Sequence, residues 1–301
     1  MHRIKTNIVR VPGARLSYEV LGQGPLLLLI PGGGNDAHHA FAGIARRLAD
    51  RYSVVIYDRR GLSRSTLDNP REEQRVETHS DDAHRLLASL GSDYEPAYVL
   101  GSSGGAIIGL DLVARHPEQV QTLIAHEPPT HLLPEHDPIQ AMESIRGVYR
   151  REGVEAALQQ LLRQPDMNPD GHELDLDIPE PMDQEQRDRF INNAIFLFEH
   201  EFPMYDRYQL DFAALKSASA RSRIVIAGGE SNHDDKAFLS AVAIAEHLGT
   251  TIVEFPGRHT GYVTNPSAFA QRLHEVLSQV LIRESPAISS DPTGAQARSL
   301  E

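Results

Sequence analysis

The sequence has 301 residues, no cysteine, and an excess of acidic side chains that gives a formal net charge of −13. The lack of cysteine excludes disulfides, thiolate catalysis and zinc bound through sulfur. The negative charge repels phosphate backbones, so no nucleic-acid partner is expected. The amino-terminal residues lack the apolar segment of a secretory signal, and the longest apolar run, Leu26–Ile30, is too short to cross a bilayer. We expect a cytoplasmic monomer or homodimer with no membrane partner.

Short apolar runs alternate with helical patterns over most of the chain, which is typical of a mostly parallel sheet flanked by helices. A hairpin is predicted at the start, where two alternating runs flank Pro12 and Gly13. Six further strands are expected at 26–30, 53–58, 97–100, 121–126, 222–227 and 251–255, with helices at 41–51, 81–90, 106–115, 234–248 and 266–282. The pattern therefore predicts an α/β protein with an eight-stranded sheet.

The alternation stops between residues 130 and 219. This stretch carries helical patterns at 139–151, 154–162 and 184–200, separated by a segment rich in Pro and Asp at 165–181. We interpret 130–219 as a helical cap inserted into a core domain that is formed by 1–129 and 220–283. Residues 284–301 have the composition of a disordered tail.

The candidate nucleophile lies in the sequence Gly-Ser-Ser-Gly-Gly at 101–105. It fits the pattern G-x-S-x-G, and it leaves a predicted strand and enters a predicted helix, as that motif requires. The sharp turn presents the central hydroxyl at the edge of the sheet. The motif therefore indicates Ser103, and not the neighbouring Ser102, as the nucleophile.

Two backbone N–H groups are needed to stabilise the oxyanion of a tetrahedral intermediate. One is expected from Gly104, directly after the nucleophile, and the other from Gly33 in the loop Pro-Gly-Gly-Gly at 31–34. Gly32, Gly34 and His38 are expected to line the substrate site. A phosphate-binding loop is disfavoured because the Walker lysine and the G-x-G-x-x-G spacing are both missing.

The candidate general base is His259, one of 15 histidines in the sequence. It follows the last predicted strand and precedes the last long helix. A loop at that place lies at the carboxyl edge of the sheet, as the nucleophile does. A neutral imidazole there can take the serine proton and return it to the leaving group.

The position of the third member, a carboxylate that orients the imidazole, is ambiguous in the sequence. The usual place is the loop after the penultimate strand, where the chain has Ser231 or Asn232 in the expected register. Glu127 ends the strand after the nucleophile and is followed by two prolines, so we favour it as the acid. Glu230 is the alternative.

Three other features are interpreted as structural. The polar loop at 58–65 is read as a turn held by Arg–Asp pairing, and an apolar stretch in the cap is read as packing between helices or, second, as a substrate wall: Phe196, Phe198, Phe202, Met204 and Tyr205. His38, His39 and His126 have no carboxylate at ligand spacing, so no metal site is expected. No cofactor is expected either.

Together, the segments at 31–34, 57–61, 101–105 and 255–259 resemble those of the α/β-hydrolase superfamily over nearly the whole folded chain. Within it, the combination of 101–104, 126–133 and 256–263 is similar to fungal zearalenone lactonases. That resemblance implies a helical cap over the active site and a triad acid at the position matching Glu127.

These features predict a cofactor-free serine hydrolase, a carboxylesterase or lactonase, that acts on a small-molecule ester or lactone. Two alternatives stay open. The same triad serves hydrolysis of carbon–carbon bonds and cofactor-free perhydrolysis, and the fold also allows a ligand-binding module with a vestigial triad.

Overall fold

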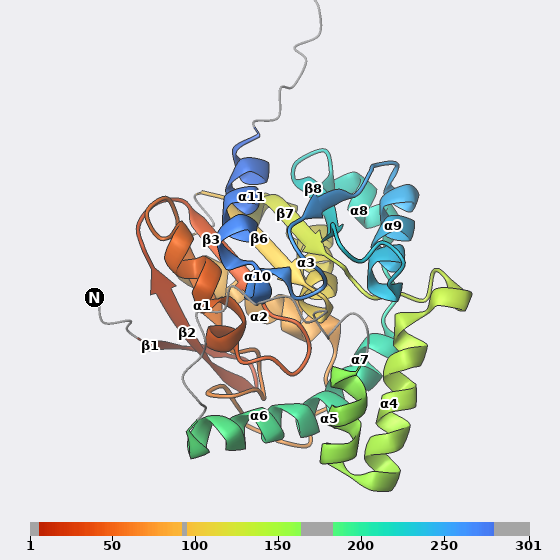
Figure 1. Ribbon diagram of the computed structural model, residues 1–301. Coiled ribbons are helices and arrows are strands. Elements are labelled where there is room, and N and C mark those ends of the chain that lie inside the picture. The colour runs from red at the N-terminus through yellow and green to blue at the C-terminus, as the bar shows by residue number, and fades with distance from the viewer. Residues whose placement is uncertain (1–5, 92–94, 164–182, 280–301) are drawn as a thin grey trace, which may run out of the picture.

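A mostly parallel sheet forms the centre of the protein in the computed structural model, which describes residues 6–91, 95–163 and 183–279 (Figure 1). The strand order is β1-β2-β4-β3-β6-β7-β8-β9. The strands are β1 (Thr6–Val11), β2 (Ala14–Leu21), β3 (Leu26–Ile30), β4 (Ser53–Tyr57), β6 (Ala97–Ser102), β7 (Val120–His126), β8 (Arg223–Gly229) and β9 (Val253–Phe255). These eight strands confirm the prediction. A ninth, β5 (Thr66–Leu67), pairs with β2 and is too short to leave a sequence pattern.

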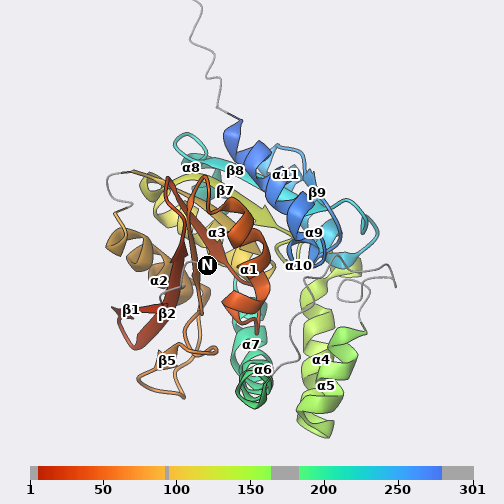
Figure 2. The same ribbon diagram turned by 60° about the vertical axis from the view of Figure 1, so that its left-hand side comes forward.

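Helices cover both faces of the sheet (Figures 1 and 2). One face carries α1 (Ala37–Leu48), α10 (Gly261–Thr264) and α11 (Pro266–Ser278), and the other carries α2 (Val76–Ser89), α3 (Gly104–Arg115), α8 (Phe212–Ala218) and α9 (Lys236–Leu248). Strand β3 shows why. Its side chains alternate between the two faces, with Leu27 and Leu29 packed on the α1 side and Leu28 and Ile30 on the α3 side. A strand buried on both faces is apolar throughout.

The register of the parallel strands brings their carboxyl ends to one edge. Ile30 pairs with Gly101, Ser102 pairs with His126, and His126 pairs with Ala227. The residues that follow these positions therefore lie side by side in loops at that edge, where ligands bind in open α/β sheets.

The cap lies at this edge and is made of α4 (Pro138–Glu152), α5 (Val154–Leu162), α6 (Gln184–Phe196), a π-helical turn η3 (Leu197–Glu201) and α7 (Phe202–Arg207) (Figures 1 and 2). It has its own apolar core, which includes Ile145, Leu158, Phe198 and Phe202. Asp137 caps α4, and Asp183 forms a capping box at the start of α6.

The chain between 130 and 219 is helical where it is described, with the expected helix at 184–200 ending in the π-helical turn. Helix α8 packs on α3 and α9 of the core rather than on the cap helices. The segment at 165–181 and the tail at 284–301 lie outside the described residues. Within the described part of the chain, the helices are too short or too polar to span a bilayer.

Candidate active site

Ser103 stands in a strained turn between β6 and α3. Its backbone has φ 53° and ψ −122°, a conformation that side-chain-bearing residues rarely adopt. The Ser103 N–H donates to the carbonyl oxygen of His126 at 2.8 Å, which fixes the turn to the neighbouring strand. Ser102, by contrast, is a fully buried residue of β6. The structure therefore has the strand–turn–helix geometry that presents the Ser103 side chain at the sheet edge.

The glycines of the motif are required by close approach of the backbone. A Cβ at Gly105 would lie 2.2 Å from the carbonyl oxygen of Ile30, and one at Gly101 would lie 2.3 Å from the carbonyl oxygen of Gly105. Both distances are far below van der Waals contact, so neither position accepts a side chain without moving backbone. The small residues allow α3 to start directly against the end of β3.

Glu127 and His259 form a buried hydrogen-bonded pair. The His259 ring Nδ1 lies 2.5 Å from Glu127 Oε2. The other carboxylate oxygen, Oε1, accepts hydrogen bonds from the Gly229 N–H at 2.8 Å and from Asn232 Nδ2 at 3.0 Å. Glu127 also has a positive φ of 49°, and in the described chain it shares this trait with Ser103 and Ser63 among non-glycine residues. Such strain concentrates at functional sites.

The environment of Glu127 favours its charged form. Burial alone would raise the pKa of this carboxyl group, but the hydrogen bond and charge of His259 and the N–H of Gly229 lower it to about 2. The preceding residue, His126, is fully buried, and its ring packs on Phe255 and Phe269. Burial lowers the pKa of His126 to about 4, so this ring is neutral at pH 7. Of these two histidines, His259 is therefore the one that can carry the positive charge opposite Glu127.

The alternative acid, Glu230, is exposed, and its backbone N–H donates to the carbonyl oxygen of Phe255. The usual acid position in this loop carries Asn232 instead, which is buried and donates to Glu127. An amide there supplies a hydrogen bond to a carboxylate that comes from the neighbouring strand. The contacts therefore favour Glu127 over Glu230 as the partner of His259.

The loop at 32–34 lies beside the nucleophile and under the cap. A Cβ at Gly32 would lie 3.2 Å from the Cβ of Ser103. A Cβ at Gly33 would meet Leu197 at 2.6 Å, and one at Gly104 would meet the Tyr205 hydroxyl at 2.1 Å. Two cap side chains thus contact the two glycines that are expected to supply the oxyanion N–H groups.

The polar loop at 58–65 is partly the structural turn that the sequence predicts. Arg64 binds Asp58, and Arg60 binds Asp82 of α2 through two hydrogen bonds of 2.7 Å. Arg59 departs from this pattern. It is fully buried, contacts Glu201 of the cap, and donates to the carbonyl oxygen of Gly32 at 2.8 Å.

The apolar stretch of the cap is divided between two surroundings. Phe198 and Phe202 pack in the cap's own core, as predicted. Met204 and Tyr205 pack with residues of the α3 face of the sheet. Tyr205 is therefore part of the contact between cap and core, and neither its position nor that of Glu201 carries a local sequence signal.

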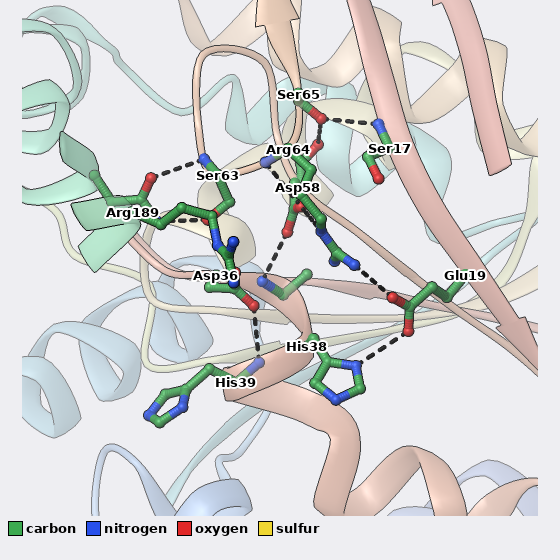
Figure 3. Close-up of polar contacts among 12 residues, drawn as sticks. Ser17, Glu19, Asp36, His38, His39, Asp58, Ser63, Arg64, Ser65 and Arg189 are labelled. Carbon is green, nitrogen blue, oxygen red and sulfur yellow. Dashed lines mark hydrogen bonds and ion pairs between the residues drawn. The ribbon is translucent and has the colours of Figure 1, made fainter. Parts of the chain in front are cut away.

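A cavity of about 560 Å³ opens next to the oxyanion loop, between α1, α6 and α10. Gly34, His38, Arg189 and Tyr262 are among its lining residues, whereas Gly32 and the three residues of the candidate triad are not. Its polar wall is an ordered network, in which Glu19 accepts from Arg64 at 2.5 Å and contacts Nδ1 of His38 at 3.1 Å (Figure 3). His38 is therefore held at the rim of the site by a core carboxylate.

Residues 6–91, 95–163 and 183–279 contain no group of three or more His, Asp or Glu side chains that could hold a metal ion. Two titratable groups at the sheet edge, Glu127 and His259, are paired with each other.

Residues 25–266 match the family described as the alpha/beta hydrolase fold. A Bacillus subtilis (strain 168) protein described as the uncharacterized hydrolase YraK is 42% identical over 282 residues, which cover 92% of this chain and 97% of that protein. The zearalenone hydrolase of Bionectria ochroleuca is 28% identical over 137 residues, 44% of this chain and 50% of that enzyme.

Solved structures share the same fold. An alpha/beta hydrolase from Sphaerobacter thermophilus DSM 20745 has a TM-score of 0.66 and 22% identity, covering 90% of this chain and 100% of that one. A hydrolase from Pseudomonas aeruginosa PA01 has a TM-score of 0.67 and 22% identity, covering 91% and 98%. The family match over residues 25–266 and the 42% identical hydrolase show that the chain belongs to the α/β-hydrolase superfamily and is a hydrolase.

Proposed function

We propose that the protein is a serine hydrolase that cleaves carboxylic esters or lactones of small molecules, with Ser103 as nucleophile, His259 as general base and Glu127 as the acid. The observation that carries this proposal is the buried contact between His259 and a charged Glu127, at the edge where Ser103 stands in its strained turn. A carboxylate at Nδ1 orients the imidazole and stabilises the imidazolium that forms during proton transfer.

In the acylation step, the Ser103 oxygen attacks the substrate carbonyl carbon while His259 Nε2 takes the hydroxyl proton. The π electrons of the carbonyl move to its oxygen, and the N–H groups of Gly33 and Gly104 stabilise that oxyanion. Collapse of the tetrahedral intermediate breaks the bond between carbon and the alcohol oxygen. The leaving alkoxide takes the proton from His259, and the acyl group stays on Ser103.

In the deacylation step, His259 takes a proton from water, and the resulting hydroxide equivalent attacks the acyl carbon. The second tetrahedral intermediate collapses with the Ser103 oxygen as leaving group, which regains its proton from His259. An ester gives a separate acid and alcohol. A lactone gives one product that carries both groups.

The substrate class rests on two supports. The partial similarity to a zearalenone hydrolase favours a lactone or ester, and the contact of Glu127 with His259 agrees with the acid position that this resemblance implies. The cavity lined by Gly34, His38 and Tyr262 offers space for part of a small molecule beside the oxyanion loop.

The test is steady-state hydrolysis of 4-nitrophenyl butyrate and of a panel of lactones by the wild-type protein and by Ser103→Ala. We expect activity in the wild type and a fall to near background in the variant, because the nucleophile is lost. Ser103→Ala that keeps wild-type activity would refute the assignment. Adding carbon–carbon hydrolase substrates and peroxide-dependent halogenation to the panel tests the other chemistries of the same triad, and a wild type inert on all of them favours a ligand-binding module.

A further inference from the structure

A fully buried ion pair joins the cap to the core directly beneath the oxyanion loop. Arg59 follows β4, and Glu201 is the last residue of the π-helical turn η3. Both side chains have no exposed surface, and Nη1 of Arg59 contacts Oε1 of Glu201. A buried ion pair is weak evidence for stability, because removing two charges from water offsets their attraction. The pair therefore points to a role other than stability.

Both members of the pair hydrogen-bond to the backbone of the oxyanion loop. Arg59 Nη2 donates to the carbonyl oxygen of Gly32 at 2.8 Å. The N–H of Gly34 donates to Glu201 Oε2 at 2.7 Å. These contacts lie on either side of Gly33, whose N–H is the expected oxyanion donor.

The contact at Gly32 acts on the same peptide group that carries this donor. The Gly32 carbonyl and the Gly33 N–H belong to one planar trans peptide, so they point in opposite directions. When Arg59 holds the carbonyl oxygen, it fixes the plane and turns the Gly33 N–H away from Arg59. A positive charge at the carbonyl also polarises the peptide and strengthens its N–H as a donor.

The charge of Arg59 is maintained in spite of its burial. Burial disfavours the charged form, but Glu201 more than offsets this effect, and the pKa of Arg59 lies above its ordinary value. The cap side supports the same arrangement, because Leu197 packs on Gly33 and Tyr205 packs on Gly104. The segment from Leu197 to Tyr205 therefore contacts both expected oxyanion donors, and it also supplies Glu201, the partner of Arg59.

We propose that Arg59 is a positioning residue that orients the Gly33 N–H through the Gly32 carbonyl, and that Glu201 makes this orientation depend on the seated cap. This inference rests on the proposed serine-hydrolase function. It follows that the oxyanion hole is fully formed only when the cap carboxylate reaches Arg59 and Gly34. A substrate bound without the cap in place would lack one of the two donors.

The test replaces the whole pair by apolar side chains, Arg59→Met with Glu201→Met, so that neither variant side chain leaves a buried unpaired charge. The matched control is Arg60→Met with Asp82→Met. That pair is also buried and starts from the same loop, but Arg60 donates to the backbone carbonyl oxygen of Pro12 and not to the oxyanion loop. Each variant is assayed for melting temperature, for kcat and KM on 4-nitrophenyl butyrate, and for the rate of labelling by a fluorophosphonate.

We expect the Arg59/Glu201 variant to fold and to lose about 10–100-fold in both kcat and labelling rate, with KM changed by less than about 3-fold. This loss is smaller than that for deletion of an oxyanion donor, about 10²–10³-fold, because the Gly33 N–H is misdirected and not removed. The Arg60/Asp82 control should keep kcat and labelling within about 2-fold of the wild type. A folded Arg59/Glu201 variant with wild-type rates overturns the proposal, as does an equal loss in the control.

If the Arg59/Glu201 double variant does not fold, Glu201→Gln carries the test. It keeps an oxygen for the Gly34 N–H and removes the charge that faces Arg59. A fall of about 3–10-fold in kcat at unchanged KM supports the proposal, and an unchanged kcat overturns it. A wild-type protein that neither hydrolyses the ester nor reacts with the fluorophosphonate contradicts the proposed function itself, which separates the two failures.

Discussion

The two halves of the candidate site are built in different ways. The half that would transfer protons comes from the ends of core strands, and the contact between His259 and Glu127 is supported by Gly229 and Asn232 of the neighbouring loop. The half that would bind the oxyanion is also on core loops, but cap side chains pack against it and bind its backbone. Changes at Glu127 and its hydrogen-bond partners should therefore affect proton transfer, whereas changes at the contact between the cap and the oxyanion loop should affect oxyanion binding.

The largest effect is expected from Glu127→Gln. An amide keeps the shape of the carboxylate but lacks the charge that stabilises the imidazolium, and a change of this kind lowers kcat by about 10³–10⁴-fold. Glu230→Gln is the matched control and should stay within about 2-fold of the wild type, because Glu230 is exposed. Steady-state kinetics on 4-nitrophenyl butyrate decide between them, and a larger loss in Glu230→Gln would reverse the assignment of the acid.

A smaller loss is expected from Asn232→Ala. This variant removes one hydrogen bond to the buried carboxylate of Glu127, and a hydrogen bond to a charged group contributes about 1.5–3 kcal/mol. We expect kcat to fall by about 10–100-fold, since the carboxylate is held less firmly against His259. Ser231→Ala, at the exposed neighbouring position, should change nothing. Equal kinetics for the two variants would show that Asn232 does not position the acid.

The pH dependence of stability tests the core half in the absence of substrate. The pKa of His126 is about 4 in the folded protein and about 6.5 in the unfolded chain, so the unfolded state binds more protons between these values. The free energy of unfolding should therefore fall with falling pH, by about 2 kcal/mol for His126 between pH 7 and pH 5. Urea unfolding of wild type and His126→Leu measures it.

We expect the variant to show a shallower pH dependence in this window. Glu127 contributes in a lower pH range. Its pKa is lowered to about 2, so its contribution to stability is lost only as the pH falls below about 4.5. An identical slope for wild type and variant between pH 7 and pH 5 would contradict the neutral, buried state of His126.

The smallest effect is expected from Gly104→Ala, at the contact between Tyr205 of the cap and the residue after the nucleophile. Gly104→Ala places a methyl group 2.1 Å from the Tyr205 hydroxyl, so the buried ring must move and the cap must shift. We expect a loss of about 1–2 kcal/mol in the free energy of unfolding and a drop in kcat. Gly147→Ala in α4, whose Cβ would meet only the end of Arg151, should leave kcat unchanged. If Gly104→Ala keeps both stability and kcat, Tyr205 does not pack closely against Gly104.

The sequence predicts the core half better than the cap half for a physical reason. Ser103 lies in a motif whose strand and helix are local, and His259 follows the last strand, so both positions can be found by counting elements. Glu127 could be favoured because it ends a strand next to the nucleophile in the sheet. The usual acid position is occupied by Asn232, which is a hydrogen-bond donor to Glu127.

The contacts of the cap could not be predicted in this way. Arg59 looks like its neighbours Arg60 and Arg64, which do hold a structural turn, and only its contact with a residue 142 positions later sets it apart. Glu201 ends a π-helical turn and lies one residue beyond the helix predicted at 184–200. Long-range side-chain pairs of this kind depend on how the cap packs on the sheet, and no local pattern records that packing.

The most direct test of the central claim is peptide mapping by mass spectrometry after reaction with a fluorophosphonate. We expect one phosphonyl group on the peptide that contains Ser103, lost in Ser103→Ala and strongly reduced in His259→Ala. Ester hydrolysis that continues while Ser103 stays unmodified, or modification of a different serine, would contradict it.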